Sequence, residues 1–337
     1  MAEERITLAG KSDIERKEMI ERIYINFPRL NHIKQQIEHC HFHSRIAAEP
    51  ECLLITGYQG AGKTTTCRSY ANRFRRESGR SGVRVPVIAT AIPVPATTKS
   101  LVTKLLMALG DPAADRGTVV NQTLRLKHLL KACGVELIIL DEFQHFIDRD
   151  SNLVLNTVSN WLKDLLNETN IPVVLAGMPY SDVILQANAQ LERRFSLRLH
   201  LDPFGWETIE QQIEFRTFLA QVDQFLPLPK RSELQAEEMA YPLYFATNGI
   251  IGYVMKLLRT AARFAIERSL SCIDLSLLAE VYQERLASSA KDRPNPFRMG
   301  LDNLKEYSVA SIQPSKGNTF NKVRITPRKS IMGNSLM

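Results

Sequence analysis

"GYQGAGKTT", residues 57–65, is the stretch that decides the fold of this chain. The apolar run Cys52–Thr56 before it is typical of a buried strand, and Lys63–Arg76 after it is helix-prone. Two glycines five residues apart let the loop curl and approach a ligand without a Cβ atom. The N–H groups of such a loop, with the start of the next helix, hold phosphate oxygens. The pattern therefore predicts a phosphate-binding loop.

Each position of this loop has a chemical role in nucleotide binding. Lys63 would reach the β- and γ-phosphates of a nucleoside triphosphate, and the Thr64 hydroxyl would ligate Mg²⁺. The residues expected to bind the nucleotide are Gly57, Tyr58, Gln59, Gly60, Ala61, Gly62, Lys63, Thr64 and Thr65.

A pair of carboxylates follows a second apolar run, "ELIILDEFQHF" at 136–146. Asp141 would stand at the carboxyl end of a parallel strand, where ligand-binding groups gather, and would hold the Mg²⁺ shell. Glu142 would polarise the attacking water. The alternative is an acidic cap of the next helix. A phosphate loop combined with this pair indicates hydrolysis as well as binding.

Strand-like and helical runs alternate along the first two thirds of the chain, which predicts an α/β fold with a five-stranded parallel sheet. After "DPFGWE" at 202–207 the pattern becomes all-helical. The expected strands are 52–56, 83–91, 137–141, 173–176 and 196–201. The expected helices are 63–76, 98–109, 119–132, 151–168 and 179–188, then 206–222, 232–246, 250–269 and 274–288.

We therefore expect an N-terminal helical segment at 1–48, a nucleotide-binding core at 49–203, a small helical lid at 204–289 and a basic tail at 290–337. From residue 291 on, nine Lys or Arg stand against three Asp or Glu, so +6 of the chain's net charge of +7 lies there. This tail is predicted to be an extended or partner-binding arm, or simply a solubilising segment.

Composition narrows the class of protein. An apolar content of 44% supports a packed core, and five scattered cysteines predict no disulfide framework, as in a reducing cytosol. The N-terminus is charged, and no apolar run approaches membrane-spanning length. We therefore expect a cytoplasmic protein that does not enter a membrane.

The order of these motifs resembles that of the AAA+ ATPases. "DEFQHF", "IPVVLAGMP", "LERRF" and "TNGIIGYVMKLL" together resemble the TniB/TnsC family of transposition regulators, including those of CRISPR-associated transposons, over about residues 20–288. The resemblance implies a bacterial ATPase that uses ATP and Mg²⁺ and forms a homo-oligomer, a helical filament or a ring, on double-stranded DNA. Its partners would be a TniQ-like target-selection protein and a DDE transposase of the TnsB/TniA type.

The resemblance also implies roles for single residues. Arg193 or Arg194 would be the arginine finger that reaches a neighbouring subunit's γ-phosphate, with Arg194 favoured. A segment between the second and third strands would follow the DNA backbone without reading bases. Its candidates are Lys99, Thr103, Lys104, Arg116 and Thr118, with Arg149 as a weaker one. For Lys99 and Lys104, an ordinary solvated helix face is the alternative.

Two positions depart from the AAA+ pattern. Where a polar sensor residue usually follows the fourth strand, this chain has Ala176-Gly177-Met178, and Tyr253 stands where the lid often carries a sensor arginine. Both changes predict slow hydrolysis. The rival functions are a helicase loader or replication initiator, and a P-loop signalling NTPase that binds no DNA.

Overall fold

The computed structural model describes residues 10–44, 47, 49–79, 82–147, 152–186, 188–285 and 294–311. Contacts divide the chain into two units, Met1–Arg298 and Met299–Met337. The second unit contains helix α13 (Leu301–Ser311). All other elements below belong to the first unit.

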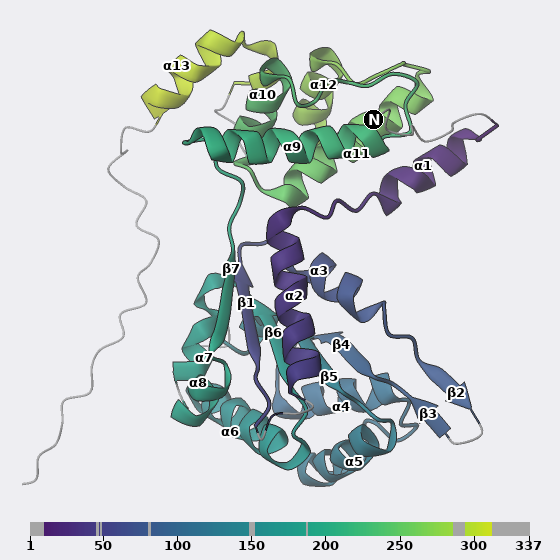
Figure 1. Cartoon of the computed structure of the whole chain (residues 1–337), viewed down its shortest axis with the longest axis vertical. Coiled ribbons are helices and arrows are strands. Elements are labelled where there is room, and N and C mark those ends of the chain that lie inside the picture. Colours follow the sequence, from purple (N-terminus) through teal and green to yellow (C-terminus); the bar gives the residue numbers. More distant parts are fainter. Residues whose placement is uncertain are drawn as a thin grey trace, which may run out of the picture. The chain divides into compact units, whose positions relative to one another are not determined.

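A five-stranded parallel sheet forms the centre of the first unit, in the order β4-β5-β6-β1-β7 (Figure 1). Its strands are β1 (Leu53–Gly57), β4 (Val87–Ala91), β5 (Leu137–Asp141), β6 (Val173–Gly177) and β7 (Leu197–Leu201). The predicted α/β fold with five parallel strands is confirmed.

One predicted strand was wrong in extent. The run 83–91 is split, because Pro86 has no N–H to donate to a sheet ladder and its carbonyl instead accepts from the backbone of residues 136 and 137. Only β4 joins the main sheet. The residues before Pro86 form β3 (Gly82–Arg84), which pairs antiparallel with β2 (Glu77–Gly79).

Helices cover both faces of the sheet, as the alternation of strand side chains requires. Leu53 and Ile55 face one cluster of buried apolar residues, and Leu54 faces the other. The first cluster includes α2 (Pro28–His43) and α3 (Lys63–Ala71). The second includes α4 (Thr98–Leu109), α5 (Val119–Ala132), α6 (Asn152–Thr169) and the short helices α7 (Val183–Gln186) and α8 (Ala189–Arg194).

The chain then becomes helical, as predicted, with α9 (Ile209–Phe225), α10 (Glu237–Thr247), α11 (Ile251–Glu267) and α12 (Leu275–Arg285), which we call the lid. The short helix η4 (Pro296–Arg298) packs on it, and Phe297 is buried against Tyr282. Residues 294–311 of the predicted tail are therefore folded and not an extended arm. No described helix has the length and apolarity needed to span a membrane.

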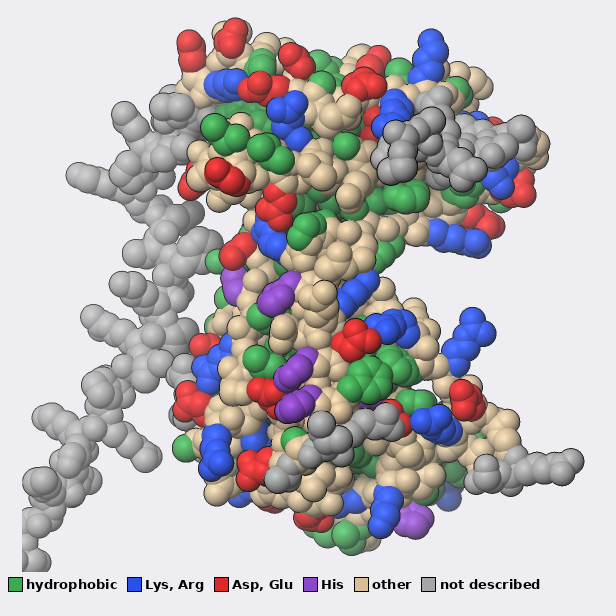
Figure 2. Space-filling view, viewed as in Figure 1, with side chains coloured by type: hydrophobic (Ala, Val, Ile, Leu, Met, Phe, Trp, Pro, Cys, Tyr) green, Lys and Arg blue, Asp and Glu red, His purple; other side chains and the backbone are tan. Residues whose placement is uncertain are grey.

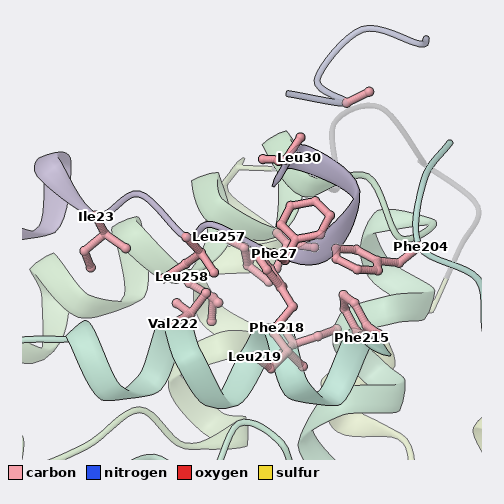
Figure 3. Close-up of a cluster of buried hydrophobic side chains, with 14 of the residues drawn as sticks. Ile23, Phe27, Leu30, Phe204, Phe215, Phe218, Leu219, Val222, Leu257 and Leu258 are labelled. Carbon is pink, nitrogen blue, oxygen red and sulfur yellow. The ribbon is translucent and has the colours of Figure 1, made fainter. Parts of the chain in front are cut away.

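Helix α1 (Asp13–Arg22) lies beside the lid helix α11, although it precedes the sheet in sequence (Figure 1). Lys17 pairs with Glu267 at 2.8 Å, and Arg16 donates to the Pro227 carbonyl at 3.0 Å. Between α1 and α2 the chain inserts Phe27 among lid side chains such as Phe218, next to Phe204 (Figure 3).

Arg29, at the start of α2, ties the two places where the chain passes between sheet and lid. Its guanidinium donates to the carbonyls of Asp202 and Pro203 at 3.0 and 3.2 Å and pairs with Glu214 on α9 at 2.6 Å. It also lies over the Phe204 ring. The entry to α2 and the exit from β7 are thereby held side by side.

Candidate active site

The loop Gly57–Thr65 connects β1 to α3, as the sequence predicts. Gly60 and Gly62 have φ angles of 81° and 105°, in the left-handed region that only glycine adopts readily. Lys63 is 8% exposed, and its Nζ donates to the carbonyls of Gly57 and Tyr58 at 2.6 and 3.0 Å. Burial lowers the pKa of Lys63, while the carboxylates of Asp141 and Glu142 act in the opposite direction.

The carboxylate pair stands at the carboxyl end of β5. Asp141 is 7% exposed, and its Oδ1 accepts the N–H of Glu142 at 2.9 Å. Glu142 has a φ of 58°, which is uncommon for a residue with a Cβ and is typical of functional sites. Glu142 lines the same cavity as Lys63 and Thr64, which puts the loop and this end of β5 in one site. Hydroxyl and carboxylate oxygens, as on Thr64 and Asp141, are the ligands that Mg²⁺ prefers.

A pocket of about 510 Å³ lies at this site. One side of it is polar and includes Lys63 and Glu142. The other side is apolar and comes from the segment before α2, from the first turn of α2 and from the lid, a wall that the sequence did not predict. Of the predicted loop residues, Gln59, Gly60, Gly62, Lys63, Thr64 and Thr65 line the pocket; the apolar wall contains Ile23, Ile25, Phe27, Leu30, Phe218, Ile251 and Met255. A pocket with one phosphate-binding and one apolar side suits a nucleotide.

The lid touches the phosphate loop directly through the first turn of α11. The N–H of Gly252 donates to the Gly60 carbonyl at 2.8 Å. A Cβ on Gly252 would lie 2.9 Å from the Gly60 Cα, so a glycine is needed for this approach. Arg259 also lines the pocket; its Nη2 donates to the Ile23 carbonyl, and its buried Nε has no hydrogen-bond partner. Tyr253 is 43% exposed and does not line the pocket, so the cation that α11 places there is Arg259.

The two candidate finger arginines differ in their surroundings. Arg194 folds back on its own chain, donating to Asn167 Oδ1 at 2.8 Å, and its Nη1 is buried without a partner. Arg193 is exposed, and its side chain makes no hydrogen bond or ion pair with another described residue. In this conformation Arg193 is the more accessible of the two.

The candidate DNA-binding residues that the structure describes lie on α4 and on the loop between α4 and α5. Lys99, Lys104 and Arg116 are exposed, and their side chains pair with no acid among the described residues. Thr118 caps α5 by accepting the Asn121 N–H, and Thr103 accepts from the buried Gln122. Arg149 is outside the described residues.

The loop that carries Arg116 has a fixed conformation. Arg125 on α5 pairs with Asp111 at 3.0 Å and donates to the carbonyls of Ala113 and Arg116. On the face shown in Figure 2, Lys and Arg side chains are interspersed with acidic ones and form no single broad basic area. On this face, binding to a polyanion would therefore depend on a few placed cations.

Comparison with known proteins agrees with this geometry. The ORC2 protein of Aeropyrum pernix in ADPNP–ADP complexes has a TM-score of 0.58 and 15% identity, covering 82% of this chain and 74% of that one. The ORC1 protein of the same organism in complex with DNA has a TM-score of 0.54, 16% identity and coverages of 82% and 72%. Cdc6p from Pyrobaculum aerophilum has a TM-score of 0.54, 14% identity and coverages of 82% and 74%. At such identities the likeness establishes the fold.

Sequence comparison gives the family. No curated protein sequence matches the chain. The family model described as bacterial TniB protein matches residues 16–205, more than half of the chain, from α1 through the last strand of the sheet. With its AAA+ fold, the chain therefore belongs to the bacterial TniB family.

Proposed function

We propose that this chain is an ATP-dependent regulator of DNA transposition that assembles on duplex DNA without sequence specificity. The observation that carries the proposal is a family match whose span includes the phosphate loop and the carboxylate pair, with loop residues and Glu142 lining one nucleotide-sized pocket. In this function the chain links a TniQ-like target-selection protein to a DDE transposase of the TnsB/TniA type.

Nucleotide binding begins with Lys63. Its ammonium exchanges two backbone carbonyls for the β- and γ-phosphate oxygens of ATP, which are stronger partners because they are charged. The apolar wall takes the base, and the contact of Gly252 with Gly60 brings the lid over the phosphate loop. Mg²⁺, held by Thr64 and Asp141, would neutralise phosphate charge.

Hydrolysis requires a group that orients and deprotonates water, and Glu142 lines the pocket for this role. An arginine from a neighbouring subunit, Arg193 or Arg194, completes the site by neutralising charge on the transferring phosphoryl group. The turnover is slow and acts as a timer: assembly persists in the ATP state and ends after hydrolysis.

DNA is bound through Lys99, Lys104 and Arg116, which are exposed and without acidic partners in the described part of the chain. Each contributes one phosphate contact, repeated in every subunit, which gives affinity without base readout. The strongly basic end of the chain has another role. Residues 312–337 contain five Lys or Arg and no Asp or Glu, and this segment contacts a partner protein.

Sedimentation with ATP or ADP, with and without duplex DNA, tests assembly. The parent chain forms large assemblies with ATP and DNA. Lys63→Ala forms none, and Glu142→Gln forms assemblies that outlast those of the parent because turnover stops. Lys230→Ala, which removes an exposed lysine of the lid region, is the matched control. Assembly of Lys63→Ala equal to that of the parent would contradict the proposal.

The salt dependence of DNA affinity tests the binding surface. Gln substitutions at Lys99, Lys104 or Arg116 flatten the slope of log affinity against log salt by about one unit per contact and protomer. Lys230→Gln makes the same charge change outside this surface. Deletion of 312–337 leaves the folded residues 294–311 in place and is expected to spare DNA binding. If this deletion abolishes DNA binding while the three Gln variants bind normally, the basic end carries the DNA.

A further inference from the structure

Gln144 is a buried amide whose position in the pocket suggests a role that the sequence motifs did not assign. It lies on the short helix η1 (Phe143–Phe146), two residues after Glu142, and is 7% exposed. It lines the nucleotide pocket together with Glu142 and Met178. A polar side chain that is almost fully buried at a pocket wall needs partners for both ends of its amide.

Both ends of the Gln144 amide have such partners. Its Nε2 donates to Glu142 Oε2, and its Oε1 accepts the N–H of Met178 at 3.2 Å. The orientation of the amide follows from chemistry, because a backbone N–H can only donate and an ionised carboxylate can only accept. Gln144 thus connects the carboxylate at the end of β5 to the end of β6.

The residue at the end of β6 packs closely against both Ser181 and this bridge. A Cβ on Gly177 would lie 2.3 Å from Ser181 Oγ and 3.2 Å from Gln144 Oε1. Strand β6 therefore has no side chain at Gly177, the position where AAA+ proteins usually carry a polar sensor residue. The amide of Gln144 occupies the adjacent space and supplies that polar group from η1.

The bridge restrains one oxygen of Glu142 and leaves the other available. Glu142 Oε1 makes no hydrogen bond to a described residue, while Oε2 is held by Gln144. The backbone of Glu142 is also restrained, through its positive φ and its N–H bond to Asp141. A base held in this way needs no reorientation before it takes a proton from water.

We propose that Gln144 is a positioning residue for Glu142: its amide fixes the carboxylate against the end of β6 and replaces the polar sensor side chain that β6 lacks. The inference rests on the proposed ATP hydrolysis and deepens it. It assigns the missing sensor function to a residue of the acidic motif. It also explains the glycine at position 177, where a Cβ would overlap neighbouring side chains.

Steady-state ATP hydrolysis by the full chain with duplex DNA tests the inference. Gln144→Leu keeps the side-chain size but removes both hydrogen bonds. It is expected to lower kcat about tenfold to a hundredfold, the effect of losing a hydrogen bond to a charged group. KM stays within about twofold, because Gln144 holds the base rather than the phosphates. Gly177→Ala is also expected to lower kcat, because its methyl group would overlap Ser181 Oγ at 2.3 Å and press on Gln144 Oε1 at 3.2 Å. Ser181→Ala, which removes a buried hydroxyl without a partner, is the matched control and hydrolyses at the parent rate.

The pH profile of kcat separates positioning from a merely structural role. The charged or titratable side chains that line the pocket with Glu142 are Lys63, His145, Arg259, Tyr24 and Tyr180, and Asp141 precedes Glu142 in the chain; none of these variants changes them. Gln144→Glu puts a second carboxylate beside Glu142, so the two share a proton and the acid limb of the profile moves to higher pH by about one unit or more. Ser181→Ala leaves the limb in place.

Different results would overturn the inference and the proposed function. If Glu142→Gln stops hydrolysis while Gln144→Leu keeps kcat within twofold and Gln144→Glu keeps the parent pH profile, Gln144 does not position the base, and the proposed function stands. If Glu142→Gln hydrolyses ATP like the parent, the role of Glu142 is wrong and both fall. A Gln144→Leu chain that loses ATP affinity as much as kcat would show a general structural role and would also overturn the inference.

Discussion

Replacing Gly252 with alanine tests whether the contact between lid and phosphate loop supports nucleotide binding. The added methyl group would lie 2.9 Å from the Gly60 Cα and 3.0 Å from the Gly60 carbonyl oxygen. Ordinary contacts of this kind start at 3.4 Å, so the first turn of α11 must withdraw by about half an ångström. The hydrogen bond from Gly252 to Gly60, now 2.8 Å, lengthens or breaks.

The loss of stability of the closed lid in Gly252→Ala follows from one favourable and two unfavourable contributions. Alanine favours the helix over glycine by about 1 kcal/mol. Loss of one backbone hydrogen bond costs about 1 kcal/mol, and a steric overlap inside a packed contact costs about 1–3 kcal/mol. The closed lid is therefore destabilised by about 1–3 kcal/mol relative to an open one, which corresponds to a loss of nucleotide affinity of about 5- to 150-fold.

Equilibrium titration of a fluorescent ATP analogue measures this loss. Tyr253→Ala is the control, because it changes the next, exposed residue of the same turn and leaves the contact with Gly60 intact. Its affinity should match that of the parent within about twofold. If Gly252→Ala binds the analogue as tightly as the parent, the lid contact contributes nothing to nucleotide binding and the reasoning is refuted.

Three further predictions concern other parts of the site. In Lys63→Met, added ATP no longer raises the unfolding temperature. Because burial lowers the pKa of Lys63, the folded parent binds fewer protons than the unfolded chain between that lowered pKa and 10.5, and its free energy of unfolding rises with pH in this window. Denaturant titrations of Lys63→Met at several pH values should lack this rise. Phe218→Ala removes a ring that is 2% exposed and lowers the free energy of unfolding by about 3–5 kcal/mol, together with ATP affinity; an unchanged denaturation midpoint would contradict the packing in Figure 3. Of the variants Arg193→Ala and Arg194→Ala, the one that lacks the finger should lose ATP hydrolysis and regain part of it when mixed with Lys63→Ala chains. ATP hydrolysis that does not depend on oligomer size would exclude an intersubunit site.

The parts of the fold that the sequence predicted well are those set by local pattern. The inner strands of the main sheet, β1, β5 and β6, are almost entirely buried and therefore read as continuous apolar runs, such as Leu137–Asp141. The phosphate loop follows from the spacing of its glycines together with Lys63 and Thr64. The error at 83–91 had a visible cause, since Pro86 interrupts the run, but the apolar pattern on both sides of it favoured one strand.

The parts of the site that escaped prediction depend on contacts between distant segments. Phe27 and Phe218 reach the same pocket wall from segments nearly two hundred residues apart, and no periodicity links them. Gln144 was visible in the acidic motif, but its partner is the backbone N–H of Met178, which follows α6 in the sequence and lies at the end of another strand. The bond from Arg194 to Asn167 likewise arises only when α8 packs on α6.

Arg29 forms a single junction about which the lid would pivot relative to the sheet. Among the described residues up to Arg298, the chain passes between lid and sheet at two places, before α2 and after β7, and Arg29 binds both crossings at one point. Two connections joined at one point would act as a pivot, so the lid would tilt about Arg29 rather than swing freely. Closure of α11 onto the phosphate loop would then be small at the pocket and larger at the helices farthest from Arg29. Loss of the γ-phosphate at the pocket would in this way displace the distant lid helices far enough for another protein to detect.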